Sequence, residues 1–62
     1  MEMRPMTNSE ILEVVRAKER NLDYIRDQYG IFSYPFSSER DSLKRWREIL
    51  AGRIPPPLVP VK

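Results

Sequence analysis

Apolar residues recur along the first half of the chain with the spacing of one helix face. They follow one another at steps of four and three residues, interrupted only by Lys18: Ile11, Val15, Leu22, Ile25 and Tyr29. At 100° per residue these side chains fall within a stripe roughly 100° wide. Just before them, Thr7-Asn8-Ser9-Glu10 has the form of a capping box. The pattern predicts a helix over about residues 8–29, with Gly30 as its stop.

A second, shorter apolar stripe follows in the second half of the chain. Leu43, Trp46 and Leu50 share one helix face, and charged residues cover the rest. Two serines before this stripe are good N-caps, and Gly52 is a suitable stop. We predict a helix over about residues 38–51.

The segment between the two stripes is rich in aromatic residues. Phe32, Tyr34 and Phe36 lie close together, with Pro35 among them. A proline cannot hold a central strand position because it lacks the amide donor. We therefore expect an irregular aromatic connector that seals one end of a small core.

The chain closes with a proline-rich tail over residues 53–62. Proline fixes φ and removes a donor, and each residue before a proline leaves the α region. The tail is therefore expected to run extended, close to polyproline II. Its apolar side chains either pack on Trp46 of the same chain or dock to another protein. Pro57 and Pro60 have the PxxP spacing, followed by Lys62, that proline-binding domains read.

Together these elements predict an all-α fold, a two-helix antiparallel hairpin with an aromatic connector and an extended proline-rich tail. The expected organisation is a flexible N-terminus over residues 1–6, a hairpin domain over 7–52 and a polyproline-II-like tail over 53–62. A chain of 62 residues buries only about 60% of its unfolded surface. It also has no cysteine for a disulfide, so we expect a partner chain to supply additional buried area.

The composition argues against several classes of function. The sequence has no histidine and no cysteine, so the usual zinc sites and nucleophilic dyads are not expected. It also has no glycine-rich phosphate loop. We therefore expect no enzyme activity, no cofactor, no metal and no small-molecule substrate. No apolar run approaches the ~20 residues of a membrane span, so we expect no membrane partner and a cytoplasmic location.

The function we predict is a small non-catalytic protein–protein interaction module, such as an adaptor, inhibitor or assembly subunit. The first apolar stripe is longer than the second helix can cover, which favours contact with another protein or with a second copy in a homo-oligomer. Trp46 is the expected anchor. The predicted partner-binding residues are Ile11, Val15, Leu22, Ile25, Tyr29, Trp46, Pro57 and Pro60.

The alternative is a nucleic-acid-associated protein that uses the basic face of the second helix. Its candidate residues are Arg40, Lys44, Arg45, Arg47 and Arg53. Basic side chains at helical spacing around a tryptophan could contact phosphates. However, Glu39, Asp41 and Glu48 are interleaved with them, and the net charge is only +2. The pattern therefore favours a protein partner over nucleic acid.

Overall fold

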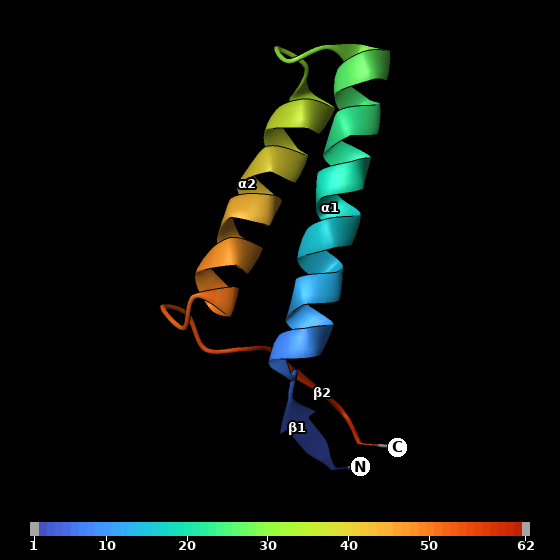
Figure 1. The fold of residues 1–62 in the computed structure, drawn as a ribbon. Helices are drawn as coiled ribbons and strands as arrows, with labels where there is room; N and C mark the ends of the chain where they lie inside the picture. The colour runs from blue at the N-terminus through green and yellow to red at the C-terminus, as the bar shows by residue number, and fades with distance from the viewer. Residues whose placement is uncertain (1, 62) are drawn as a thin grey trace.

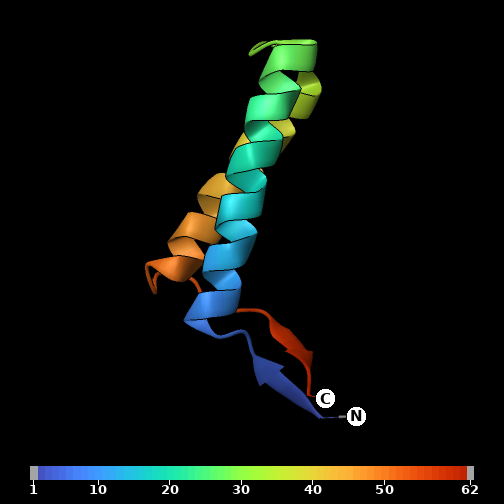
Figure 2. The ribbon, with the colours of Figure 1, turned by 45° about the vertical axis from the view of Figure 1, so that its right-hand side comes forward.

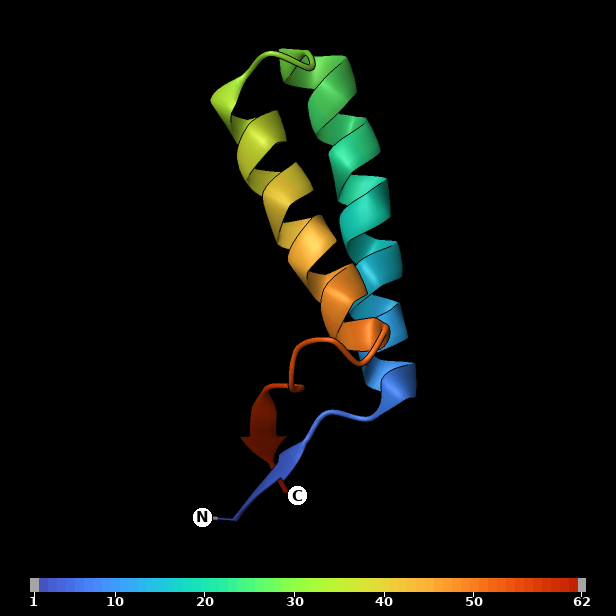
Figure 3. The same ribbon diagram turned by 90° about the vertical axis from the view of Figure 1, so that its left-hand side faces the viewer.

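Two antiparallel helices and a short two-stranded ribbon make up the fold (Figure 1). The computed structural model describes residues 2–61. The elements in chain order are β1 (Met3–Pro5), α1 (Asn8–Tyr29), α2 (Tyr34–Leu50) and β2 (Leu58–Pro60). The helices run side by side, and the ribbon projects from the end of the hairpin opposite the connector (Figures 2 and 3). The predicted helical hairpin is confirmed, and the ribbon is an addition that the sequence did not predict.

Helix α1 begins and ends where its local sequence signals place it. The Thr7 hydroxyl accepts a hydrogen bond from the Glu10 amide at 3.3 Å, and the Glu10 carboxylate accepts one from the Thr7 amide at 2.9 Å. Both halves of the predicted capping box are therefore present. At the other end, Gly30 has a φ of +87° and its amide donates to the Arg26 carbonyl at 2.9 Å.

Helix α2 begins at Tyr34, so the predicted start at residue 38 was wrong. Ser33 is its N-cap, and the Ser33 hydroxyl accepts from the Phe36 amide at 3.3 Å. Pro35 lies in the first turn, where the missing amide proton costs no intrahelical bond. The prediction failed because the serines at 37 and 38 are competing N-cap signals, whereas Ser33 is the N-cap and proline is well tolerated in a first turn. The connector between the helices therefore shrinks to residues 30–33.

The end of α2 is a Schellman motif, in which the chain closes on the last turn through two backbone hydrogen bonds. The Arg53 amide donates to the Glu48 carbonyl at 3.0 Å, and the Gly52 amide donates to the Ile49 carbonyl at 3.1 Å. Gly52 has the positive φ, +83°, that this turn requires. The Arg53 guanidinium also pairs with the Glu48 carboxylate at 3.1 Å. This ion pair occupies the position where an apolar contact usually accompanies the motif.

The buried core lies in the half of the hairpin nearer the ribbon. Among the described residues, the buried side chains are Ile11, Val15, Leu43 and Ile49. Five partly buried hydrophobic residues pack against them: Met6, Leu22, Trp46, Leu50 and Ile54. The first residues of the tail therefore contribute Ile54 to the core of the same chain.

The ribbon ties the two ends of the described chain together. Arg4 lies opposite Val59, flanked by the pairs Met3–Pro60 and Pro5–Leu58. The Met6 amide donates to the Pro57 carbonyl, and the Val61 amide donates to the Glu2 carbonyl, each at 3.0 Å. We expected a flexible segment over residues 1–6. Instead, residues 3–5 form a strand, while Met1 and Lys62 lie outside the described residues.

Two prolines occupy the outer edges of the ribbon. In an antiparallel pair, alternate residues point their backbone groups toward the partner strand and away from it. The hydrogen bonds at Met6 and Val61 fix this alternation, so the backbone nitrogens of Pro5 and Pro60 face outward. At these positions proline removes no bond within the ribbon and takes a free donor off each edge.

Candidate binding surfaces

The apolar stripe of α1 divides into an internal part and an exposed end. Ile11 and Val15 are only 1% and 5% exposed and belong to the core of this chain. Leu22 and Ile25 are half-buried, and Tyr29 is 63% exposed. A partner could reach Ile11 or Val15 only by opening the hairpin. The predicted contact surface is therefore reduced to the end of the stripe near the connector.

Trp46 and the two tail prolines also lie differently from expectation. Trp46 is half-buried and packs against the core cluster, so its side chain is already engaged within the chain. The tail divides: Ile54 at its start packs against the same core cluster as Trp46, whereas β2 at its end lies against β1, and its backbone does not approach α2 within the described residues. Pro60 is exposed, whereas Pro57 is half-buried and its carbonyl accepts from Met6. A proline-binding domain could read this segment only after it detached from β1.

A cluster of exposed aromatic and aliphatic side chains marks the turn between the helices. We name it the hydrophobic tip, and it consists of Tyr29, Ile31, Phe32 and Tyr34. Phe32 is 97% exposed and Tyr34 is 83% exposed. The expectation that the connector seals the core was therefore wrong for these two residues, although Phe36 is half-buried. Large apolar side chains gathered at a surface commonly mark an interaction site.

Hydrogen bonds hold the turn that carries the tip. The Gly30 carbonyl accepts from the Ser33 hydroxyl at 2.7 Å and from the Ser33 amide at 3.4 Å. The same hydroxyl accepts from Phe36 at the start of α2. Ile31 and Phe32 are thus the two central residues of a tight turn closed by Ser33. A fixed turn loses little conformational entropy on binding, which favours contact with a partner.

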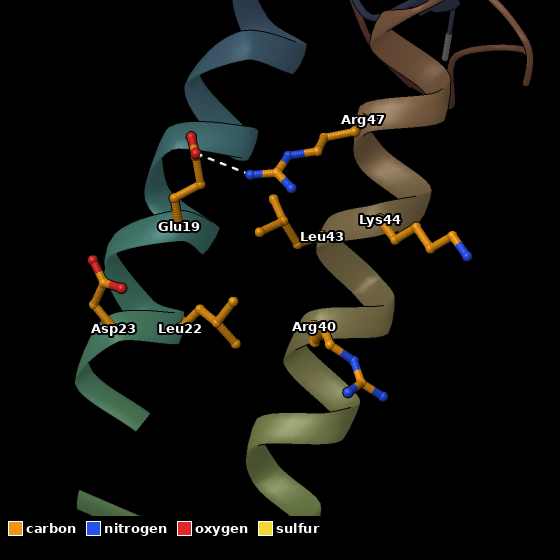
Figure 4. Close-up of a pocket in the computed structure, with 7 residues that line it drawn as sticks. All are labelled: Glu19, Leu22, Asp23, Arg40, Leu43, Lys44 and Arg47. Atoms are coloured by element: carbon orange, nitrogen blue, oxygen red, sulfur yellow. Dashed lines mark hydrogen bonds and ion pairs between the residues drawn. The ribbon is translucent and has the colours of Figure 1, made fainter. Parts of the chain in front are cut away.

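One side of the hairpin carries a groove between the helices with charged walls (Figure 4). Leu22 and Leu43 point toward one another at its floor. The remaining lining residues are charged: Glu19 and Asp23 on α1, with Arg40, Lys44 and Arg47 on α2. The Glu19–Arg47 ion pair, 3.0 Å long, bridges the walls at one end, and the Lys44 side chain extends away from α1.

The five basic residues of the nucleic-acid alternative do not form one surface. Arg40, Lys44 and Arg47 line the groove, whereas Arg45 does not. Arg53 lies beyond the end of α2 and pairs with Glu48. Arg47 pairs with Glu19 at 3.0 Å, and Arg40 pairs with Asp41 at 3.6 Å. These carboxylates offset the positive charges of both arginines. The positive field along α2 is therefore reduced.

On the opposite side of the hairpin, one ion pair links the two helices. Lys18 on α1 pairs with Glu39 on α2 at 3.1 Å, with only 25% and 18% of the two side chains exposed. The Asn21 amide group donates to the other oxygen of Glu39 at 3.0 Å. Lys18, the polar residue within the apolar stripe, therefore links the helices. Beside this pair lies a shallow groove lined by Val14, Ala17, Lys18, Asn21 and Glu39.

At the ribbon end, Arg4 of β1 binds the capping carboxylate of α1. The Arg4 guanidinium donates two hydrogen bonds to Glu10, at 2.7 and 3.0 Å. These bonds from Arg4, with a further one from the Thr7 amide, lower the pKa of Glu10 to about 2. The same carboxylate raises the pKa of Arg4. This arrangement anchors the ribbon to the helix, and each group already has its partner within the chain.

Other kinds of site find no support in the residues described. Across residues 2–61, no cluster of three or more acidic, histidine or cysteine side chains could hold a metal ion. None of the helices within this range combines the length and apolar character needed to cross a membrane. Comparisons with protein families, curated proteins and solved structures gave no match to this chain.

Proposed function

We propose that the protein is a non-catalytic interaction module that binds another protein through its hydrophobic tip. The observation that carries this proposal is the exposure of Phe32, at 97%, together with that of Tyr34 and Tyr29 beside it. Of the predicted stripe, Tyr29 belongs to the tip, whereas Ile11 and Val15 are buried in the core and are no longer proposed as contact residues. The absence of cysteine from the sequence fits action in a reducing compartment such as the cytoplasm.

The energetics of the tip support a protein partner. Burying an exposed phenylalanine side chain yields about 1.5–3 kcal/mol, and aromatic residues dominate protein interfaces. Tyrosine adds a hydroxyl that can bond at the rim of a pocket. The tip is also attached to two helices whose core lies at the far end, so a partner can cover Phe32 without disturbing Ile11 or Leu43. An apolar pocket with polar groups at its rim would match these side chains.

A photo-crosslinking experiment tests this proposal directly. Phe32 is replaced with p-benzoylphenylalanine, which keeps an aromatic ring at the tip, and cells producing the protein are irradiated. We expect a discrete covalent adduct with one protein. Excess unmodified protein should suppress that adduct, whereas excess F32S/Y34S double variant should not.

The matched control carries the same probe at Arg16, an exposed position on the charged side of α1. It should give no competable adduct. Equal crosslinking from positions 16 and 32, or equal competition by the double variant, would show that the tip is not the contact surface. The double variant should keep its circular dichroism spectrum, because both side chains lie outside the core.

The nucleic-acid alternative retains one specific observation in its favour. Arg40, Lys44 and Arg47 lie along one side of α2, although acidic residues face them. We would measure binding to a fluorescent single-stranded oligonucleotide at 50 and 200 mM salt. A steep loss of affinity with salt, together with loss of binding in R40E/K44E, would favour this function. The affinity of the tip for its protein partner should instead change little between the two salt concentrations, because salt does not screen apolar contacts.

A further inference from the structure

A second regular pattern runs along α1 beside the stripe that packs on α2. Val14, Ala17, Asn21, Tyr24 and Gln28 follow one another at steps of three, four, three and four residues. This is the spacing of the a and d positions of a coiled coil. Val14, Asn21 and Gln28 take the a positions, and Ala17 and Tyr24 take the d positions. We name these five residues the α1 seam.

The α1 seam is uncharged and largely uncovered. Ala17, Asn21 and Gln28 are exposed, Tyr24 is 60% exposed and Val14 is half-buried. At 100° per residue the seam spans an arc about 80° wide. It lies beside the α2-facing stripe, and Glu13 and Arg20 border it on the other side. The preceding d position is Glu10, which Arg4 already holds in an ion pair. Interface centres are depleted in charge and enriched in aromatic residues, as this seam is.

We propose that a second copy of this chain packs its α1 against this seam, in parallel and in register, as a short two-stranded coiled coil. The inference goes beyond the proposed function and does not depend on it, since the seam and the hydrophobic tip are different surfaces. The occupant and its direction follow from the residues that flank the seam.

The flanking charges select a parallel second copy. In a parallel pair, each g position faces the e position five residues further along the other helix. Glu13 of one copy then faces Lys18 of the other, which is an attractive pair. Lys18 already pairs with Glu39 of its own chain at 3.1 Å, so Glu13 would be a second carboxylate on the same ammonium group. In an antiparallel pair that overlaps along the whole seam, the g positions face one another. Glu13 would then meet Asp27, and Arg20 would meet Arg20 of the second copy, so like charges would be opposed.

Asn21 supplies the register. Within the described residues its side chain makes one hydrogen bond, from Nδ2 to Glu39 at 3.0 Å. The second amide proton and Oδ1 can therefore bond to Asn21 of the second copy. An asparagine at one a position fixes register and strand number in coiled coils, at a cost in stability. The seam has few strong hydrophobic residues, so the dimer should be weak and should dissociate on dilution.

Mass measurements test whether the seam associates. We expect the wild-type chain to approach the dimer mass in sedimentation equilibrium at high concentration and to reach the monomer mass on about 100-fold dilution. A17E places a charge in the seam and should keep the protein monomeric throughout. R16A changes the charge by the same amount on the far side of α1 and should dimerise like the wild type. A monomer at every concentration, or equal dimerisation of A17E, would overturn the proposal.

A cysteine experiment tests the direction. The natural chain has no cysteine, so Q28C introduces a single thiol at an a position. In a parallel dimer the two thiols face one another within disulfide range, and mild oxidation should yield a covalent dimer. D23C, on the charged side of α1, should remain uncrosslinked. If Q28C fails to crosslink to itself but V14C crosslinks to Y24C, the pair is antiparallel and the inference is wrong.

Discussion

Arg4 and Glu10 join the two parts of the fold through a bidentate ion pair, with nitrogen–oxygen distances of 2.7 and 3.0 Å. Arg4 belongs to β1, and Glu10 belongs to the capping box of α1. One carboxylate therefore serves both helix initiation and ribbon attachment. An isolated two-stranded ribbon is marginal in water, so this attachment matters for β1 and β2.

The ribbon should loosen in acid before the helices do. The pKa of Glu10 falls from its ordinary 4.5 to about 2 on folding. A carboxylate with a lowered folded pKa contributes stability above its unfolded pKa and loses it as the pH falls through the folded pKa. Amide hydrogen exchange at Val59 should therefore accelerate between about pH 4.5 and pH 2.

E10Q provides the control for this acid response. The amide cannot accept the two charge-assisted bonds from Arg4 and does not titrate, so the variant should show faster exchange at Val59 already at neutral pH. Its exchange rates, corrected for the intrinsic pH dependence, should then lack the acid transition. The same transition in wild type and E10Q would mean that another group controls the ribbon.

The two ion pairs between the helices should differ in strength. Lys18 and Glu39 are 25% and 18% exposed, whereas Arg47 and Glu19 are 57% and 47% exposed. Solvent screens the second pair more, so we expect coupling energies of about 1 kcal/mol for Lys18–Glu39 and about 0.3 kcal/mol for Glu19–Arg47. Double-mutant cycles in urea, with K18M/E39Q and E19Q/R47M, measure both. Equal couplings would show that this difference in exposure has no effect.

The two ends of the α1 stripe should respond oppositely to truncation. Ile11 is 1% exposed, so I11A should lower the unfolding free energy by about 3 kcal/mol, enough to unfold much of a small domain. Tyr29 is 63% exposed, and Y29S should change stability by about 0.5 kcal/mol or less. Urea denaturation followed by circular dichroism compares them. A large loss in Y29S would place Tyr29 in the core.

The edge prolines should keep the ribbon from recruiting further strands. P5T and P60T together restore an outward amide donor to each edge, which makes the ribbon a template for pairing with other chains. We expect increased light scattering and a gain of β signal in circular dichroism on concentration. P55T, outside the ribbon, is the matched substitution and should behave like the wild type. No difference between the variants would mean that the prolines do not protect the edges.

Local signals predicted α1 well because they lie within a few residues of one another. Thr7 and Glu10 satisfy each other's backbone groups, and this exchange requires no distant part of the chain. The start of α2 was missed because the serines at 37 and 38 are competing N-cap signals. The sequence did contain the correct N-cap signal: Ser33 lies three residues before Phe36, and the Ser33 hydroxyl accepts a hydrogen bond from the Phe36 amide.

The ribbon and the tip could not be predicted from local patterns. Arg4 and Val59 pair across nearly the whole chain, and no short-range periodicity records such a register. The periodicity placed Ile11 and Tyr29 on one stripe but could not say how far α2 covers it. The aromatic connector was expected to turn inward. A turn of only four residues, 30–33, holds Phe32 at the surface instead.

The Val61 amide donates to the Glu2 carbonyl at 3.0 Å, so the two ends of the described chain lie side by side. A short peptide joining residues 2 and 61 would therefore close this part of the polypeptide into a ring without displacing either helix. Such cyclisation removes conformational freedom from the unfolded chain and should raise the melting temperature. The ring would not change Phe32, which lies at the other end of the hairpin. Circular permutants opened within residues 30–33 would instead interrupt the tip.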